Sequence, residues 1–302
     1  MEMTLIADSG STKTDWVLMP ADSTAPRQTA LQTGTTLRTQ GINPIHQDDG
    51  QIAAILRDEL LPLIARQTGG GGGPASITAI RFYGSGVRPD QEERMERLLR
   101  EAFATHPSLT TDSSTLIEAH SDLLGAARAL CGGGEGLACI LGTGANSCLY
   151  DGRQIVANTP ALGYILGDEG SGAVLGIRFL NALYKGSLSS DTRTAFEAEM
   201  QTTLAGVIDH VYRQPMANRW LASLSPFIHN RLADPAVEAL VVDNFAAFIA
   251  RNIEPYRRRD LPLNAVGSIA YYYSDQLRQA ATKAGYAVGK ILRSPLEQPG
   301  AC

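Results

Sequence analysis

The chain has 302 residues and a net charge of −5, and 44% of its residues are hydrophobic and 19% charged. This length predicts two domains or one large one, and the acidic balance argues against a nucleic-acid partner, which usually requires a basic face. No apolar run reaches the 18 residues that suggest a transmembrane helix, and the N-terminus lacks a signal-peptide pattern. We therefore expect a cytoplasmic protein without a membrane partner.

The chain opens with two apolar runs, Met3–Ala7 and Trp16–Met19, separated by the polar stretch Asp8–Asp15. This order predicts a strand, a tight turn and a second strand. A third strand is expected at Gln28–Thr33. After it, Asn43 stands before a proline, which places it at the apex of a loop.

The polar stretch has the composition of a phosphate-binding turn. Gly10 allows the chain to turn tightly, and backbone N–H groups beside Ser11 and Thr12 can hold phosphate oxygens. Lys13 adds a positive charge, and Asp8 can hold a cation or its water shell. A polar hairpin without a ligand has the same features, so this stretch alone leaves both interpretations open.

The next segments alternate between helix and strand. Apolar residues four apart predict a helix over Ile52–Ile64, and the poly-glycine run that follows it predicts a flexible connector. Glutamate and arginine at helical spacing predict a second helix, Arg88–Phe103, whose charges form a solvated face with local ion pairs. Strands are expected at Ile77–Tyr83, before Gly84-Ser85-Gly86, and at Thr115–Glu118. This order predicts an α/β layer.

A helix is expected to begin at His120-Ser121-Asp122 and to run through Ala129. Serine and aspartate are common N-cap residues, and from these residues alone an N-cap role for Asp122 is favoured. Three glycines at 132–134 end this helix.

The pattern of the N-terminus recurs around residue 142. A strand is expected at Leu137–Leu141, a small-residue turn at Gly142–Asn146, and further strands at Ser147–Tyr150 and Gln154–Ala157. Two domains built alike would place two phosphate-binding turns opposite each other across a cleft. The turn is a weak dinucleotide fingerprint because strand follows it instead of helix, and no Walker A sequence occurs in the chain.

The segment Gly163–Gly172 is a glycine-rich loop with two adjacent acids, Asp168 and Glu169, before an apolar helix at Ala173–Leu183. Asp168 either complements the helix dipole or faces a metal or a hydroxyl group. Helices are expected from about 191 to 259. The chain then returns to a strand, a glycine turn, a helix and a strand at, respectively, Leu263–Val266, Gly267–Ala270, Tyr271–Ala284 and Val288–Leu292.

The four cysteines, Cys131, Cys139, Cys148 and Cys302, form no C-x-x-C pair and have no zinc-ligand spacing. We expect buried or unreactive thiols rather than a metal site or an iron–sulfur cluster.

Taken in order, the DxGxTK turn, the helix-start Asp122, the GTG turn, the GDEGSG loop and the GSIA turn resemble the actin-like ATPase superfamily. The likeness is greatest to the branch that holds N-acetylglucosamine kinases and BadF/BadG-type ATPases, and it extends from Thr4 to Ile291. The resemblance implies an α/β fold of two actin-like (ribonuclease H-like) domains, each a mixed sheet flanked by helices, with a cleft between them. The implied domains are residues 1–118 and 119–302, with a helical insertion at about 172–260.

The resemblance also implies roles for individual residues. Asp122 takes the catalytic-base position, which overrides the N-cap interpretation, and Asp8 and Asp168 lie near Mg²⁺. The family often has tryptophan where this chain has Leu162, which leaves the exact sugar open. The implied ATP contacts are Gly10, Ser11, Thr12, Lys13, Gly142, Thr143, Gly144, Ala145, Gly267, Ser268 and Ala270. The implied sugar contacts are Asn43, Ser85, Gly86, Asp122, Leu162, Gly163 and Asp168.

The implied activity is an ATP- and Mg²⁺-dependent kinase that phosphorylates a hydroxyl group, expected to be the 6-hydroxyl, of N-acetylglucosamine or a related amino sugar. Three alternatives stay open: a kinase of another small hydroxyl compound, a BadF/BadG-type activator of a dehydratase, and a non-catalytic nucleotide or sugar sensor. The activator would need paired cysteines for a cluster, which the cysteine spacing does not offer. Asp8, Asp122 and Asp168 argue against the sensor. A homodimer is an expectation from the family alone.

Overall fold

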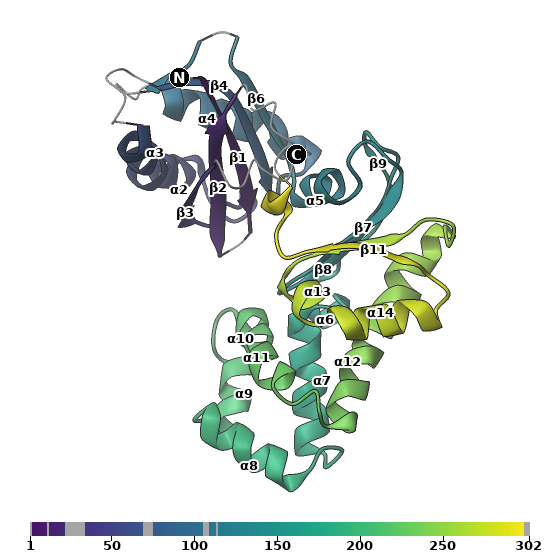
Figure 1. Cartoon of the computed structure of the whole chain (residues 1–302). Helices are drawn as coiled ribbons and strands as arrows, with labels where there is room; N and C mark the ends of the chain where they lie inside the picture. The colour runs from purple at the N-terminus through teal and green to yellow at the C-terminus, as the bar shows by residue number, and fades with distance from the viewer. Residues whose placement is uncertain are drawn as a thin grey trace. The chain divides into compact units, whose positions relative to one another are not determined.

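The computed structural model describes residues 2–10, 12–21, 34–68, 75–104, 109–112 and 114–298. The chain divides into two compact units, shown in Figure 1. We call Met1–Gly132 together with Pro295–Cys302 the N-terminal unit, and Gly133–Ser294 the C-terminal unit.

The N-terminal unit is built on one sheet. Its strands are β1 (Glu2–Ser9), β2 (Lys13–Pro20), β3 (Thr35–Gln40), β4 (Ala75–Gly84), β5 (Leu109–Thr110) and β6 (Leu116–Ser121). Its helices are α2 (Asp49–Ala54), the π-helical turn η1 (Ile55–Leu60), α3 (Leu61–Thr68), α4 (Pro89–Ala104), α5 (Asp122–Cys131) and η4 (Pro295–Glu297).

The sheet combines an antiparallel hairpin with parallel strands. β1 pairs antiparallel with β2, and β2 pairs antiparallel with β3. β4 lies parallel to β1 on the other side, and β5 and β6 lie parallel to β4. Three consecutive residues of β1, Leu5, Ile6 and Ala7, are buried, as expected for a central strand that is covered on both faces.

The helices of the N-terminal unit follow the apolar spacing of the sequence. Ile52, Leu56, Leu60 and Ile64 are all buried and belong to one core cluster with β1, β2 and α4. Helix α5 contacts β1, β4 and β6, and η4 contacts β1 and α5. These contacts put the division between the units after Gly132, whereas the sequence placed it after residue 118.

The C-terminal unit contains the second sheet, with β7 (Gly136–Leu141), β8 (Ala145–Tyr150), β9 (Ile155–Thr159), β10 (Leu263–Val266) and β11 (Val288–Leu292). Its helices before β10 are α6 (Gly163–Leu166), α7 (Gly172–Tyr184), α8 (Ser190–Glu199), α9 (Leu204–Tyr212), α10 (Ala217–Ser223), α11 (Ser225–His229), α12 (Pro235–Phe248), η2 (Ile249–Ile253) and η3 (Glu254–Tyr256). Two helices follow β10, namely α13 (Ser268–Tyr272) and α14 (Ser274–Lys283).

The second sheet repeats the strand order of the first. Its order is β11-β10-β7-β8-β9, with β7, β8 and β9 antiparallel and β10 and β11 parallel to β7. The corresponding order in the first sheet is β6-β4-β1-β2-β3. The two units are therefore two copies of one topology, as the recurrence of the turn motif in the sequence predicts.

The helices between β9 and β10 share one core cluster with the second sheet. Phe179, Phe196 and Phe227 come from three of these helices, and their ring centroids lie 5.3–5.7 Å apart. Aromatic pairs at this separation contribute to stability beyond the apolar area that they bury. No helix in the described part of the chain is long and apolar enough to cross a membrane.

The predicted elements agree with most of these bounds. The strands predicted at Leu263–Val266 and Val288–Leu292 are confirmed to the residue. The helix predicted at Tyr271–Ala284 is wrong in its start and its continuity, because α13 and α14 are separate helices that meet at Tyr273. The last strand of the first sheet ends at Ser121, beyond the predicted Glu118. The predicted strand at Gln28–Thr33 and the poly-glycine connector lie outside the described residues.

Candidate active site

Ser9, at the end of β1, joins the loops that carry the predicted sugar contacts. Its hydroxyl group is 2.7 Å from the hydroxyl group of Thr14, donates to the carbonyl oxygen of Ile42 at 3.0 Å and accepts from the N–H group of Ile42 at 3.1 Å. Its carbonyl oxygen accepts from the N–H group of Ser85 at 2.8 Å. Ser9 is fully buried, so these bonds replace its bonds to water.

Asn43 and Gly86 are brought together at this edge of the sheet. The side-chain oxygen of Asn43 accepts from the N–H group of Ile45 at 3.0 Å. Gly86 has a φ of 84°, and a Cβ atom built on it would lie 2.3 Å from that oxygen. Only glycine tolerates both the left-handed backbone and this close approach.

Asp122 is the first residue of α5, and the N-cap is Ser121, whose hydroxyl group accepts from the N–H group of Leu124. Register pairs Ser9 with Gly84, and Gly84 with Ser121. Asp122 therefore follows β6 at the edge where β1 and β4 also end, the edge at which α/β folds bind ligands. The N-cap role that the residues alone favoured for Asp122 is therefore wrong, because Ser121 is the cap.

The carboxyl group of Asp122 is mostly withdrawn from solvent. This burial raises its pKa to about 6, although hydrogen bonds from backbone N–H groups, including that of Leu123 at 2.8 Å, oppose the shift. A buried charge is unfavourable without a partner, so the neutral form persists to a higher pH.

The predicted phosphate-binding turn of the N-terminal unit is a tight hairpin in which the N–H group of Gly10 donates to the carbonyl oxygen of Lys13 at 3.0 Å. Thr12 is exposed, whereas Ser11 lies outside the described residues. The Lys13 ammonium group forms an ion pair with Asp15, and so does Arg38. Burial of Asp15 would raise its pKa, but its bonds to Arg38 and Lys13 lower it overall.

The second turn, in the C-terminal unit, lies directly against Asp168. A Cβ atom on Gly144 would be 3.0 Å from the Asp168 carboxylate. Burial raises the pKa of Asp168, while the N–H groups of Gly163 and Ala145 oppose this shift. Asp168 has a φ of 56°, a conformation that is uncommon for residues other than glycine and often marks functional sites.

The N-terminus of α7 is attached to the same turn. The N–H groups of Gly172 and Ala173 donate to the carbonyl oxygens of Gly142 and Thr143 at 2.8 and 3.2 Å. Within the described residues, the N–H groups of Thr143 and Gly144 have no hydrogen-bond partner. Free N–H groups beside the positive end of a helix dipole form an anion site.

The Gly267–Ala270 turn packs on the end of β7. Gly267 has a φ of 120°, and a Cβ atom on it would lie 2.3 Å from the carbonyl oxygen of Leu141. Ser268 is exposed, whereas the side chain of Ala270 is buried in the core, so only its backbone can contact a ligand. The turns at 142–145 and 267–270 and Asp168 thus lie together in the C-terminal unit.

Helix α6 starts at Gly163 and exposes Leu162, Ile165 and Leu166, the last two by 77% and 74%. The sequence predicted an irregular loop over this segment. Leu162 and Gly163 are accessible to a ligand in this conformation.

No protein-family model matches the sequence, and no curated protein matches it. Among solved structures, a protein from Porphyromonas gingivalis described as a candidate N-acetylglucosamine kinase is 44% identical, with a TM-score of 0.85 over 98% of this chain and 97% of that one. The chain belongs to the family of this protein.

Two more distant structures share the fold of the family. A candidate N-acetylglucosamine kinase from Chromobacterium violaceum is 19% identical, with a TM-score of 0.64 over 99% of this chain and 97% of that one. The actin-like protein Alp7A is 10% identical, with a TM-score of 0.52 over 100% and 95%. The predicted fold of two actin-like α/β domains is confirmed.

The turn at 142–145 and the carboxylate of Asp168, both in the C-terminal unit, have the chemistry that suits the phosphates of ATP and Mg²⁺. The free N–H groups of Thr143 and Gly144 and the open space over Gly142 suit phosphate oxygens. No group of three potential ligands for a metal occurs in the described chain. Mg²⁺ is usually bound through one or two carboxylates together with substrate phosphates, and Asp168, which lies against the 142–145 turn within the C-terminal unit, offers one carboxylate there.

Sequence reasoning missed the residues that hold the family motifs in place. Ser9 and Thr14 are fully buried polar residues within the first motif, and a serine at the end of an apolar strand was their only signal. Asn244 is also fully buried, and its side chain bonds the N–H group of Gly170 and the carbonyl oxygen of Ser171, both at 3.3 Å. Nothing in the helical pattern around Asn244 indicates this contact.

Proposed function

We propose that the protein is an ATP-dependent kinase that phosphorylates the 6-hydroxyl group of N-acetylglucosamine or a related amino sugar. The observation that carries the proposal is the Asp122 carboxyl group, with a pKa of about 6, at the strand edge that also presents Asn43, Ser85 and Gly86. A general base works best when its pKa lies near the operating pH. The 44% identical relative supports a sugar as the acceptor.

In the proposed reaction, Asp122 accepts the proton of the attacking hydroxyl group. The hydroxyl oxygen forms a bond to the terminal phosphorus, and the bond between that phosphorus and the bridging oxygen of ADP breaks. Asn43 and Ser85 orient the acceptor through hydrogen bonds to its other hydroxyl groups. When bound, ATP would supply the phosphoryl group, and Mg²⁺ would neutralise part of the charge on its phosphates.

The C-terminal unit would orient the phosphates. The N–H groups of Thr143 and Gly144 donate to phosphate oxygens, and the N-terminus of α7 adds a favourable dipole. Catalysis by kinases is mostly positioning and charge stabilisation, and the backbone N–H groups of this turn are suited to both.

A coupled ADP-release assay tests this function. We expect N-acetylglucosamine or another amino sugar to give the highest kcat/KM in a panel that also contains glucosamine, N-acetylmannosamine, glucose and mannose. A preference for a plain hexose would mean that the acceptor is another hydroxyl compound and not an amino sugar. A rate of ADP release that no sugar raises above the sugar-free rate would refute the kinase function. An anaerobic preparation with visible absorption from an iron–sulfur cluster would favour the dehydratase activator.

A further inference from the structure

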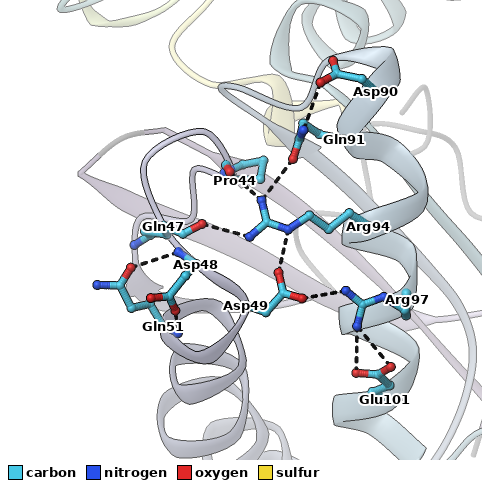
Figure 2. Close-up of polar contacts among 10 residues, drawn as sticks. All are labelled: Pro44, Gln47, Asp48, Asp49, Gln51, Asp90, Gln91, Arg94, Arg97 and Glu101. Carbon is cyan, nitrogen blue, oxygen red and sulfur yellow. Dashed lines mark hydrogen bonds and ion pairs between the residues drawn. The ribbon is translucent and has the colours of Figure 1, made fainter.

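Arg94, on α4, reaches the loop that carries Asn43 (Figure 2). We call residues 41–48 the acceptor loop. The Arg94 guanidinium group donates from Nη1 to the carbonyl oxygen of Pro44 at 2.6 Å and from Nη2 to the carbonyl oxygen of Gln47 at 3.0 Å. Pro44 lies in the turn that Asn43 opens, and Gln47 closes this turn, so one planar side chain bonds two points of the turn.

The contacts of Arg94 continue to Asn43 through Gln47. The side-chain oxygen of Gln47 accepts from the N–H group of Asn43 at 2.7 Å. The N–H groups of His46 and Gln47 donate to the carbonyl oxygen of Asn43, both at 3.1 Å. A shift of the Gln47 backbone would therefore move Asn43, whose side-chain amide is the proposed sugar contact.

Asp49 fixes the orientation of the Arg94 guanidinium group. Nε of Arg94 donates to Oδ1 of Asp49 at 2.6 Å, and Nη1 also donates to the side chain of Gln91 at 3.0 Å. The bonds from Arg97 and Arg94 lower the pKa of Asp49, so this carboxylate is charged at neutral pH. A lysine has no planar fork of donors and cannot reproduce this set of contacts.

Arg97 provides an internal comparison one turn further along α4. Its Nη2 atom donates to Oδ2 of the same Asp49 at 2.7 Å, and it forms a helical ion pair with Glu101. Among the described residues it makes no hydrogen bond with the acceptor loop, and its side chain is 49% exposed, against 25% for Arg94. Figure 2 shows the two arginines on the same helix with Asp49 between them.

We propose that Arg94 is a positioning residue for the acceptor site, which holds the acceptor loop so that Asn43 meets the sugar. The proposal rests on the sugar-kinase function proposed above, because that function makes Asn43 a substrate contact. Arg94 touches neither substrate nor reacting atoms in this role. Its loss should therefore weaken the acceptor interaction and leave the ATP interaction unchanged.

Steady-state kinetics of Arg94→Met, Arg94→Lys and Arg97→Met test the role. We expect the KM for N-acetylglucosamine, or for the best acceptor of the panel, to rise on the order of tenfold in Arg94→Met. Arg94→Lys should show most of this rise, Arg97→Met less than about a twofold change, and the KM for ATP should stay within about twofold in all three. Equal acceptor KM values in Arg94→Met and Arg97→Met, or equal rises for sugar and ATP, would overturn the proposal.

Hydrogen exchange separates this proposal from the function on which it rests. Amide exchange in residues 41–48 should accelerate in Arg94→Met but not in Arg97→Met, in the absence of any sugar. If the wild-type protein phosphorylates no sugar but this difference is found, the kinase function fails while the loop positioning stands. Unchanged exchange in the loop would refute the positioning itself. Should Arg94→Met not fold, Arg94→Lys carries both measurements.

Discussion

The two units have one topology but present different groups at equivalent loops. In each, the hairpin turn after the first strand and the loops after the third and fourth strands carry predicted site residues. The third-strand loop presents Asn43 in the N-terminal unit and Asp168 in the C-terminal unit, and the fourth-strand loop presents Gly86 and Gly267. In the proposed function, equivalent positions would thus supply side-chain contacts to a hydroxyl compound in one unit and a backbone anion site in the other.

This difference between the units follows from which helix begins at each site. In the C-terminal unit the loop leads into α7, whose N-terminus bonds to the turn at Gly142 and Thr143. In the N-terminal unit the third-strand loop leads into α2, and the helix that begins at the site is α5, with Asp122 as its first residue. A helix N-terminus against a turn of small residues favours a phosphate, whereas a largely buried carboxyl group at a strand end favours a base.

The largest effect is expected from Asp122→Asn, which removes the base from the N-terminal unit alone. General-base assistance contributes about 10²–10⁴ in rate, so kcat should fall by about a thousandfold while the KM for ATP stays within about threefold. Single-turnover kinetics at saturating sugar and ATP provide the measurement. A variant with more than about a tenth of the wild-type kcat would show that another group accepts the proton.

Two glycine substitutions, one in each unit, should raise the KM of different substrates. Gly86→Ala would push a methyl group against Asn43, and Gly267→Ala would push one against the backbone of Leu141. We expect a rise on the order of tenfold in the acceptor KM for the first and in the ATP KM for the second. Each should also lose about 1–3 kcal/mol of stability through backbone strain.

Gly285→Ala controls for strain without a clash, since Gly285 has a φ of 82° and a Cβ atom on it would meet nothing within 4 Å. It should lose about 1 kcal/mol and leave both KM values unchanged. If Gly86→Ala and Gly267→Ala altered the same KM, the division of substrates between the units would be wrong.

The raised pKa of Asp122 predicts a pH-dependent stability confined to the N-terminal unit. At about pH 3 and below, the residue is mostly protonated in folded and unfolded chains, because the ordinary pKa of aspartate is about 3.9. As pH rises towards 6, the unfolded chain loses this proton first because the folded pKa is about 6. The folded state therefore loses stability relative to Asp122→Asn, by about 1–3 kcal/mol at pH 7.

Tryptophan fluorescence can report on this unit by itself. The chain has two tryptophans, and Trp16 is fully buried in the N-terminal unit, so a Trp220→Phe background leaves only that reporter. In this background, denaturant unfolding should give nearly equal midpoints with and without the Asp122→Asn substitution at about pH 3, and different midpoints at pH 7. Equal midpoints at both pH values would mean that the Asp122 carboxyl group is freely solvated.

The sequence predicted local structure well where one periodic pattern dominates. The strand at Leu263–Val266 and the stripe from Ile52 to Ile64 follow directly from buried apolar residues at fixed spacing. The break at Tyr273 does not, because Tyr273 is fully buried with its hydroxyl group donating to the carbonyl oxygen of Ser225 at 2.6 Å. Such a tertiary contact overrides helix propensity and leaves no periodic signal.

The site motifs could be located from the sequence, but not the side chains that hold them. The charges of α4 predicted local ion pairs, and Arg97 with Glu101 confirms this. Arg94 has the same residue type and spacing, yet it bonds carbonyl groups 50 and 47 residues away in the chain. Lys13 was assigned to the nucleotide from its motif, and it pairs with Asp15 in this structure. Contacts between distant segments are set by packing, which a single sequence does not display.

The smallest change in KM is expected from substitution of Arg251, the arginine that contacts the Asp168–Glu169 loop in the C-terminal unit. Arg251 donates to Glu169 at 2.8 Å, but its side chain is 71% exposed, and among the described residues it makes no second contact with the loop. Exposed ion pairs contribute about 0–1 kcal/mol, so Arg251→Met should change the KM for ATP by less than about twofold.

The buried Asn244 holds the loop that contains Asp168, through its bonds to Gly170 and Ser171. The variant Asn244→Asp can therefore be compared with Arg251→Met. Aspartate cannot donate to the carbonyl oxygen of Ser171, which Asn244 does now, and it would bury a charge without a cationic partner. We expect the ATP KM to rise more in Asn244→Asp than in Arg251→Met, with the acceptor KM unchanged in both. A larger effect from Arg251→Met would mean that both units hold their loops with an arginine. The expected order would mean that the charged side chain of Arg94 holds the acceptor loop, whereas the neutral side chain of Asn244 holds the loop that contains Asp168.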